Sequence, residues 1–543
     1  MKVYEAVARA ISDATDSPIF GLMGDGNMDL MVEFAERHRR TLVHARHEQN
    51  AVAMADGYAR FSGRPGLGSV TQGPGLTNTA TSLTVARHHR SPVLLLAGQT
   101  SLGDMHNPQR LDQGAFTTAT AGAGVVIENE KMVAPALDAV FRHLHAGLGP
   151  FVLNLPYNVQ TTDLSDDWSY ARPSAPMASE PEEAAVDRAA DLLLQAERPA
   201  ILAGRGAVLA GADAVIGELA TALGAPIASS LVAKGICSDH PFAVWVSGGL
   251  GQGIAEEALS DCDILLAVGA SLNQWTTNHG ELVRNRKIIQ IDADPTAFGA
   301  YASPTLALLG DARLTTQRLC GAVRRRGGKA HAQPRLPGLS RRQDYADAEN
   351  GHVDPRRALD VLQDVLPPDR IIVADGGHSA QAICQKLTVR NPRDWAYSFD
   401  FACIGQGLGL AIGACFARPG QRVTLVTGDG SLMMNMADLD TAVRYDLPLT
   451  IIILNDEGFG QERHTLGHKG LPERHARYAS PDFAKLAESL GGRGRRLEGR
   501  PGLNELRSWV RDDEHSGGLI MLDIPINGAV ELPVSQELVR HIH

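Results

Sequence analysis

Two acidic residues near the C-terminal end of this chain each follow a strongly apolar segment. The segment 423–427 (VTLVT) ends two positions before Asp429, and the segment 449–454 (LTIIIL) ends two positions before Asp456. Both segments are rich in β-branched residues and predict buried strands, and the apolar residues between them recur at helical spacing. Parallel strands joined in this way have their carboxyl ends at one edge of a sheet, where open α/β sheets bind ligands. The sequence therefore predicts an α/β fold with both acids at a binding edge.

The two acids lie in glycine-containing motifs, Gly-Asp-Gly-Ser at 428–431 and Asn-Asp-Glu-Gly-Phe-Gly at 455–460. Glycines let a diphosphate approach the backbone, and carboxylate oxygens suit magnesium. The pair of motifs resembles the thiamine-diphosphate motif, in which Gly-Asp-Gly is followed after roughly thirty residues by a pair that is usually Asn-Asn. The resemblance implies Mg²⁺ ligands at Asp429, Asp456 and the Gly458 carbonyl. It also implies cofactor contacts at Gly428, Gly430, Ser431 and Phe459.

Asp456 departs from this pattern, because Asn is commoner at its position in the family. The additional negative charge lies beside a diphosphate. We therefore expect cofactor binding to require a filled metal site and to depend on pH.

A second region resembles the pyrimidine domain of the same enzymes. A predicted strand, 41–45, leads into Glu48 and a helix that contains the sequence ADGYAR, and a strand at 67–71 precedes the turn GPGLTN. The resemblance assigns Glu48 to the aminopyrimidine ring of the cofactor. A partly desolvated carboxylic acid can protonate a ring nitrogen and favour the imino tautomer, whose nitrogen removes the thiazolium C2 proton. A glutamate at a helix start also interacts favourably with the helix dipole without any such role.

Composition excludes several classes of protein. The chain has 543 residues, enough for about three domains, and its net charge of −11 argues against a nucleic-acid surface. Its six cysteines are scattered without a CxxC pair, which indicates reduced thiols in a cytoplasm rather than disulfides or a zinc site. Charge appears early at the N-terminus, and no apolar segment approaches the length of a membrane span. We expect a cytoplasmic protein without a signal peptide.

The order of strands and helices predicts three doubly wound α/β domains with mostly parallel sheets. We expect an N-terminal pyrimidine-binding domain at 1–170, a central Rossmann-like domain at 184–325 and a C-terminal diphosphate- and magnesium-binding domain at 350–543. Two stretches, 172–183 and 324–342, are predicted linkers. In some relatives the central domain holds FAD or an adenine nucleotide. Here Gly204-x-Gly206 lacks a third glycine, so we expect no FAD.

Two further segments are candidates for cofactor binding. The loop 375–379 follows a predicted strand at 370–374, and its Gly377, His378 and Ser379 offer backbone amides and short polar side chains. Ile404 falls where relatives place a bulky apolar residue that holds the cofactor in its bent shape. The alternative is that Ile404 is an ordinary core residue without a role in cofactor binding.

Three residues are candidates on the substrate side. The segment 20–27 resembles the pyruvate and indolepyruvate decarboxylases, in which an acid at the position of Asp25 faces the active site, and a second acid six residues after the metal-binding position corresponds to Glu462. These acids could handle the protons of an enamine intermediate. His106 lies in a loop comparable to the one that carries an adjacent histidine pair in those decarboxylases. The alternatives are turn chemistry for Asp25, pairing of Glu462 with Arg463 and a surface position for His106.

Two other histidine-containing segments receive structural interpretations. His88 and His89 form an adjacent pair in a helix, and we expect a solvated helix face there. His464, His468 and Lys469 follow the second motif and could bind a substrate carboxylate. We expect this segment to be a mobile polar loop, not a zinc site.

The resemblance implies an enzyme that needs thiamine diphosphate and magnesium. The first interpretation is non-oxidative decarboxylation of a 2-oxo acid to an aldehyde through an enamine intermediate. An acetolactate-synthase-like carboligase, a lyase acting on a 2-hydroxy ketone or 2-hydroxyacyl-CoA, and a protein that has lost catalysis are the alternatives. Because Glu48 of one chain serves the cofactor of another in this family, the resemblance also implies a homodimer or homotetramer.

Overall fold

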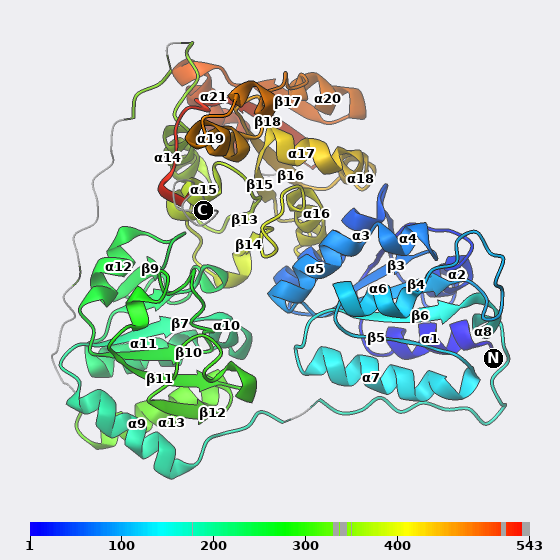
Figure 1. The fold of residues 1–543 in the computed structure, drawn as a ribbon, viewed down its shortest axis with the longest axis horizontal. Helices are drawn as coiled ribbons and strands as arrows, with labels where there is room; N and C mark the ends of the chain where they lie inside the picture. The colour runs from blue at the N-terminus through cyan, green and yellow to red at the C-terminus, as the bar shows by residue number, and fades with distance from the viewer. Residues whose placement is uncertain (176, 329–335, 337–344, 349, 512–516, 535–543) are drawn as a thin grey trace.

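The computed structural model describes residues 1–175, 177–328, 336, 345–348, 350–511 and 517–534. Figure 1 shows three units at the corners of a triangle: an N-terminal unit in blue and cyan, a central unit in green, and a C-terminal unit in yellow to red. Each unit is built on one six-stranded sheet in which every strand pair is parallel. The prediction of three α/β units is thereby confirmed.

The N-terminal sheet has the strand order β2-β1-β3-β4-β6-β5. Its strands are β1 (Ile19–Gly21), β2 (Leu42–His44), β3 (Gly66–Val70), β4 (Val93–Gln99), β5 (Gly124–Val126) and β6 (Phe151–Pro156). Its helices are α1 (Val3–Ser12), α2 (Met28–Glu36), α3 (Glu48–Ser62), α4 (Pro74–Thr77), α5 (Ala80–His89), α6 (Gln113–Thr120), α7 (Val133–His145) and α8 (Tyr157–Gln160).

The central sheet has the strand order β12-β11-β10-β7-β8-β9. Its strands are β7 (Pro199–Ala203), β8 (Ile227–Ser229), β9 (Ala243–Val246), β10 (Ile264–Val268), β11 (Lys287–Asp292) and β12 (Leu306–Leu309). Its helices are α9 (Glu183–Gln195), α10 (Arg205–Ala210), α11 (Asp213–Leu223), α12 (Gly253–Ser260) and α13 (Ala312–Arg325). The predicted linker 324–342 lies mostly outside the described residues, and the helix α13 includes its first two positions.

The C-terminal sheet has the strand order β14-β13-β15-β16-β18-β17. Its strands are β13 (Ile371–Ala374), β14 (Trp395–Tyr397), β15 (Val423–Gly428), β16 (Leu449–Asn455), β17 (Arg493–Arg496) and β18 (Leu519–Pro525). Its helices are α14 (Pro355–Val365), α15 (Ala380–Lys386), α16 (Gly407–Ala417), α17 (Asp429–Asn435), α18 (Leu439–Arg444), α19 (Gly460–His468), α20 (Phe483–Leu490) and α21 (Gly499–Arg511). The central strands are buried on both faces, which explains their continuous apolar sequences.

The N-terminal and C-terminal units meet through α3 and α16. Small residues bring the two backbones close: a Cβ on Gly57 would lie 2.2 Å from the Leu410 carbonyl oxygen, and one on Gly413 would lie 2.0 Å from the Met54 carbonyl oxygen. Apolar side chains of both helices share one buried cluster. This contact fixes the helix that begins with Glu48 against the C-terminal unit.

The helices of the described part of the chain were compared with the requirements of a membrane span. None of them combines sufficient length with sufficient apolar character to cross a bilayer.

Candidate active site

Three loops at the carboxyl edge of the C-terminal sheet face one cavity. The neighbouring strands β13, β15 and β16 are followed by residues 375–379, 429–431 and 456–460. Residues from all three segments line a cavity of about 1250 Å³ that extends to the central unit. This edge is where open parallel sheets bind ligands.

Asp429 begins α17 and is buried. Its Oδ2 accepts hydrogen bonds from the Gly458 backbone N–H (3.2 Å) and the Ser480 hydroxyl (2.6 Å), whereas its buried Oδ1 has no hydrogen-bond partner. Burial, together with the nearby charge of Asp456, raises the pKa of Asp429 to about 7. A divalent cation would satisfy Oδ1 and favour the ionised carboxylate, so the environment of Asp429 fits a metal ligand.

Asp456 directly follows β16 and contacts His378 from the first loop. The His378 Nδ1 lies 3.1 Å from the Asp456 Oδ2, and the His378 Nε2 lies 2.5 Å from the Val530 carbonyl oxygen. His378 therefore connects the first loop with Asp456 and with the segment that follows β18.

Gly458 joins the second and third loops. Its N–H donates to Asp429, and its carbonyl oxygen accepts a hydrogen bond of 3.2 Å from the Tyr478 hydroxyl. A Cβ at this position would lie 2.2 Å from the Ala476 carbonyl oxygen, so the close approach requires glycine. The carbonyl retains a second lone pair that could serve a cation. Phe459 follows, partly exposed at the cavity wall.

Asp375 fixes the arrangement of the loops. The hydroxyl groups of Ser398, Thr427 and Ser431 all donate hydrogen bonds to its carboxylate. Ser431 also accepts a hydrogen bond of 2.8 Å from the Gly405 N–H. Its hydroxyl proton is therefore engaged inside the protein, and the remaining polar contribution of Ser431 to a ligand is its backbone N–H.

Other candidates for diphosphate contact line the cavity with fewer constraints. Gly377 has a φ of +115°, which favours glycine, and a Cβ on Gly428 would meet only the Leu454 carbonyl oxygen at 3.9 Å. Ser379 precedes α15, and Gly430 lies in the first turn of α17. These backbone positions leave room for an anion beside the helix starts.

Ile404 also lines the cavity, beside the loop 375–379. A Cβ on Gly376 would lie 3.2 Å from the Ile404 Cγ2 and 3.3 Å from the Phe399 Cβ. Ile404 and Phe399 therefore flank the same point of the backbone, next to the glycines of the first loop.

The candidates on the substrate side lie in two different places. Glu462 is on α19 and lines the cavity. Glu48, Asp25 and His106 belong to the N-terminal unit and lie outside this cavity. Glu48 is buried and accepts a hydrogen bond of 2.9 Å from Asn78, whereas Asp25 and His106 are exposed in loops.

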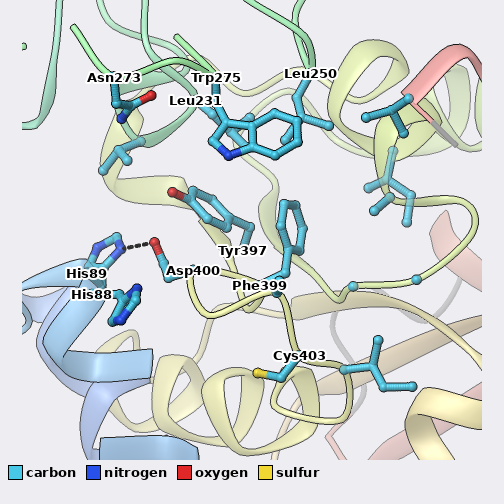
Figure 2. A pocket seen from close by; sticks show the side chains of 18 of the residues that line it. His88, His89, Leu231, Leu250, Asn273, Trp275, Tyr397, Phe399, Asp400 and Cys403 are labelled. Carbon is cyan, nitrogen blue, oxygen red and sulfur yellow. Dashed lines mark hydrogen bonds and ion pairs between the residues drawn. The ribbon is translucent and has the colours of Figure 1, made fainter. Parts of the chain in front are cut away.

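The expectation of a solvated face at His88 and His89 is wrong for His89. The His89 Nδ1 lies 3.2 Å from the Asp400 Oδ1, and its side chain is 12% exposed. Figure 2 shows this contact at the wall of the cavity. His89 lies at the C-terminal end of α5, where three units meet, and the Arg205 guanidinium donates to its carbonyl oxygen.

Arg60 completes this buried charged cluster. Its guanidinium donates to Asp56 one turn earlier on α3 and, at 3.0 Å, to Asp400. The spacing of Asp56 and Arg60 is visible in the sequence as an i,i+4 pair. Asp400 is far away in the sequence, and no local pattern connects it to the pair.

The expectation of a polar loop at 464–469 is also wrong. The helix α19 continues to His468, and Gly467 lies only in its last turn, where a glycine costs at most about 1 kcal/mol. The His464 Nε2 lies 3.2 Å from the His378 Nε2, and burial, followed by the charge of His378, lowers the pKa of His464.

The glycines of the central unit serve packing. A Cβ on Gly204 would lie 2.3 Å from the Gly269 carbonyl oxygen, and one on Gly206 would lie 2.7 Å from the Gly269 Cα. The close approach of two strand ends thus accounts for both glycines.

The protein side chains do not by themselves make a complete metal centre. Among the described residues, no group of three or more His, Cys, Asp or Glu side chains could hold a metal ion. Two carboxylates, one carbonyl and oxygens of a bound diphosphate would make up the set that magnesium prefers. The orphaned Asp429 Oδ1 fits such a shared site.

The three parallel sheets and this cavity define a cofactor-dependent α/β enzyme. The chain matches three family models: "Thiamine pyrophosphate enzyme, N-terminal TPP binding domain" over residues 1–120, the central domain over 186–319 and the "C-terminal TPP binding domain" over 375–524. It is 30% identical, over 98% of its length and 93% of the relative, to a probable acetolactate synthase large subunit of Methanocaldococcus jannaschii. The chain therefore belongs to the thiamine-pyrophosphate enzyme family.

Two other similarities span nearly the whole chain. The acetolactate synthase isozyme 3 large subunit of Escherichia coli is 27% identical over 97% of this chain and 95% of its own length. The solved structure of a thiamine diphosphate-dependent 4-hydroxybenzoylformate decarboxylase of Rhodococcus jostii RHA1 has a TM-score of 0.81 at 20% identity, covering 97% of this chain and 99% of that one. The latter similarity is one of fold.

Proposed function

We propose that this enzyme is a thiamine-diphosphate- and magnesium-dependent decarboxylase that converts a 2-oxo acid into an aldehyde without oxidation. The observation that carries the proposal is the buried Asp429, with one unsatisfied oxygen, facing a cavity that Glu462 also lines. The first acid suits the metal of the cofactor, and the second is a proton donor within the same cavity.

The candidate residues have separate roles in binding the cofactor and in proton transfer. Asp429, Asp456 and the Gly458 carbonyl would hold magnesium, and the diphosphate would lie against the loops that contain Gly377, His378, Ser379, Gly428, Gly430, Ser431 and Phe459. Ile404 would contact the ring system of the cofactor. When bound, thiamine diphosphate supplies an electron sink that makes loss of carbon dioxide possible. Glu462 or Asp25 would deliver a proton to the product carbon, and His106 would assist from its loop.

Glu48, Asp25 and His106 would act on the cofactor and substrate of a second chain. All three lie outside the cavity that their own chain forms, which supports sites shared between two copies. We therefore propose a homodimer or a homotetramer in the cytoplasm, with Glu48 hydrogen-bonded to the aminopyrimidine of its partner's cofactor.

A carboligase is the second candidate, because the two relatives described above are named acetolactate synthase large subunits. Both reactions begin with decarboxylation of a 2-oxo acid. They differ in the fate of the carbon that has lost carbon dioxide. If an acid such as Glu462 protonates the product carbon, release of an aldehyde is favoured. If no acid protonates that carbon, its attack on a second carbonyl compound is favoured instead.

Product identification separates these reactions. The purified enzyme would be supplied with thiamine diphosphate, magnesium and a panel of 2-oxo acids from pyruvate to benzoylformate and phenylpyruvate, with Asp429→Ala as the matched control. Aldehyde formed by the wild type and not by the control supports the proposal. Hydroxyketones or acetolactate-type products assign the enzyme to the carboligases, and no turnover of any acid directs the search to 2-hydroxy ketones and acyl-CoA substrates.

A further inference from the structure

The cavity continues beyond the cofactor loops into a region with aromatic walls. Figure 2 shows the indole of Trp275 on one side and the rings of Tyr397 and Phe399 on the other, with Leu231 and Leu250 beside the indole. Trp275 and Leu250 come from loops of the central unit, and Leu231 begins a short 3-10 helix of that unit. The two other rings come from the segment at the end of β14. The region is thus enclosed by two units of one chain.

The aromatic region adjoins the end of the site that Ile404 occupies. As described above, Phe399 and Ile404 both approach Gly376, at 3.3 Å and 3.2 Å from the position of a Cβ on that residue. The centroids of the Tyr397 and Phe399 rings lie 4.8 Å apart. A ligand group that extends past Ile404 along this cavity wall could therefore contact these rings directly.

Contacts of its backbone fix the position of the chain at Trp275. Its carbonyl oxygen accepts a hydrogen bond of 3.1 Å from the Gly249 N–H, and a Cβ on Gly248 would lie 1.8 Å from that oxygen. The Ser247 hydroxyl binds the next carbonyl, at Thr276. Trp275 nonetheless remains 37% exposed. A partly exposed indole in a cavity wall is a surface for an apolar ligand.

The cavity has room for such a group in addition to the cofactor. Its volume of about 1250 Å³ exceeds the roughly 300–1,000 Å³ of a typical small-molecule site. Flat rings on both sides favour a planar substituent, because aromatic rings stack or meet edge to face.

We propose that the substrate is a 2-oxo acid with an aromatic side chain, and that Trp275 and Phe399 determine this specificity. This inference rests on the proposed function for the reaction. The aromatic group lies between the indole and the rings of the C-terminal unit while the oxo acid reaches the cofactor. Short aliphatic 2-oxo acids leave the rings uncovered and gain nothing from them.

The test combines turnover with binding. For the holoenzyme, kcat/KM is measured with phenylpyruvate and with pyruvate, and calorimetry measures Kd for two unreactive skeletons, 3-phenylpropanoate and propanoate. We expect the phenyl compound to be preferred by about 100-fold in both assays, because burying a phenyl group removes a large apolar surface from water. Trp275→Ala and Phe399→Ala should each lower this preference about tenfold. Phe401→Ala, an exposed ring of the same segment that does not line the cavity, should leave the preference unchanged.

The outcomes separate this inference from the proposed reaction. If the enzyme uses pyruvate as well as or better than phenylpyruvate, and binds propanoate and 3-phenylpropanoate equally, the aromatic site is contradicted. The proposed decarboxylation would not be affected by that result. Binding of 3-phenylpropanoate that depends on Trp275, without turnover of any 2-oxo acid, would support the aromatic site and contradict the reaction. If all three variants retain the preference for the phenyl compounds, Trp275 and Phe399 do not determine the specificity.

Discussion

The guanidinium of Arg60 in the N-terminal unit donates a hydrogen bond of 3.0 Å to the carboxylate of Asp400 in the C-terminal unit. Both side chains are nearly inaccessible, at 4% and 8% exposure. Arg60 lies on α3, the helix that begins with Glu48, and Asp400 lies four residues before Ile404. The ion pair therefore connects the helix of the proposed catalytic glutamate with the segment that lines the cofactor cavity.

Removal of the Arg60 charge should destabilise the fold strongly. In Arg60→Met the buried carboxylates of Asp56 and Asp400 lose their shared partner, which costs about 3–5 kcal/mol. Arg64→Met is the matched control, because Arg64 pairs with Asp16 at an exposed position, and its removal should lower the free energy of unfolding far less. Urea unfolding of the three proteins measures both values, and similar losses for the two variants would contradict the role of the buried cluster.

His89 should make stability depend on pH. Burial, and then the charge of Arg60, lowers the pKa of His89 below its ordinary value of 6.5, although Asp400 acts in the opposite direction. The unfolded chain therefore takes up the proton first, so the contribution of neutral His89 is present above about pH 6.5 and is lost as pH falls below it. The free energy of unfolding should fall between pH 7 and pH 5. His89→Gln should show a shallower fall, and parallel curves would refute this assignment.

The two acids of the proposed metal site should respond differently to substitution. Asp429→Ala removes the carboxylate with the unsatisfied oxygen, and we expect the affinity for thiamine diphosphate with magnesium to fall about 100-fold or more. Asp456→Asn retains an oxygen ligand and should still bind the cofactor. Calorimetric titration measures both affinities. Complete loss of binding in Asp456→Asn would mean that its charge is required, and unchanged binding in Asp429→Ala would place the cation elsewhere.

Glu48→Gln should fold and bind the cofactor but lose activity by about 10²- to 10⁴-fold, as expected for a lost proton-transfer group. Mixing this variant with Asp429→Ala tests whether the sites are shared. Each mixed dimer would contain one site with an intact Glu48 and an intact Asp429, so activity should return after subunits exchange. Near-wild-type turnover of Glu48→Gln alone would remove its catalytic role, and failure of the mixture to recover would place Glu48 in its own chain's site.

The core strands follow closely from the sequence. The predicted segments 370–374, 423–427 and 449–454 agree with β13, β15 and β16 to within one residue at each end. Strands that are buried on both faces need continuous apolar residues, and this local requirement is visible in one sequence. The loops after β13, β15 and β16 face one cavity because parallel strands share an edge, so the positions of Asp429, Asp456 and His378 could be anticipated.

Contacts between distant segments could not be anticipated in this way. The histidine pair at 88–89 shows no apolar or charged pattern of its own, and the partner of His89 is 311 residues away. The aromatic wall likewise combines Trp275 with Phe399 from another unit. Such pairings depend on how the units pack, which local periodicity does not encode.

The most direct test of the proposed reaction measures carbon dioxide and aldehyde in the same mixture. The wild-type enzyme, with thiamine diphosphate and magnesium, is given phenylpyruvate, and both products are quantified over the course of the reaction. We predict one aldehyde for each carbon dioxide, and neither product without the cofactor. Carbon dioxide without matching aldehyde, with the missing carbon in a hydroxyketone, would contradict the decarboxylase and identify a carboligase.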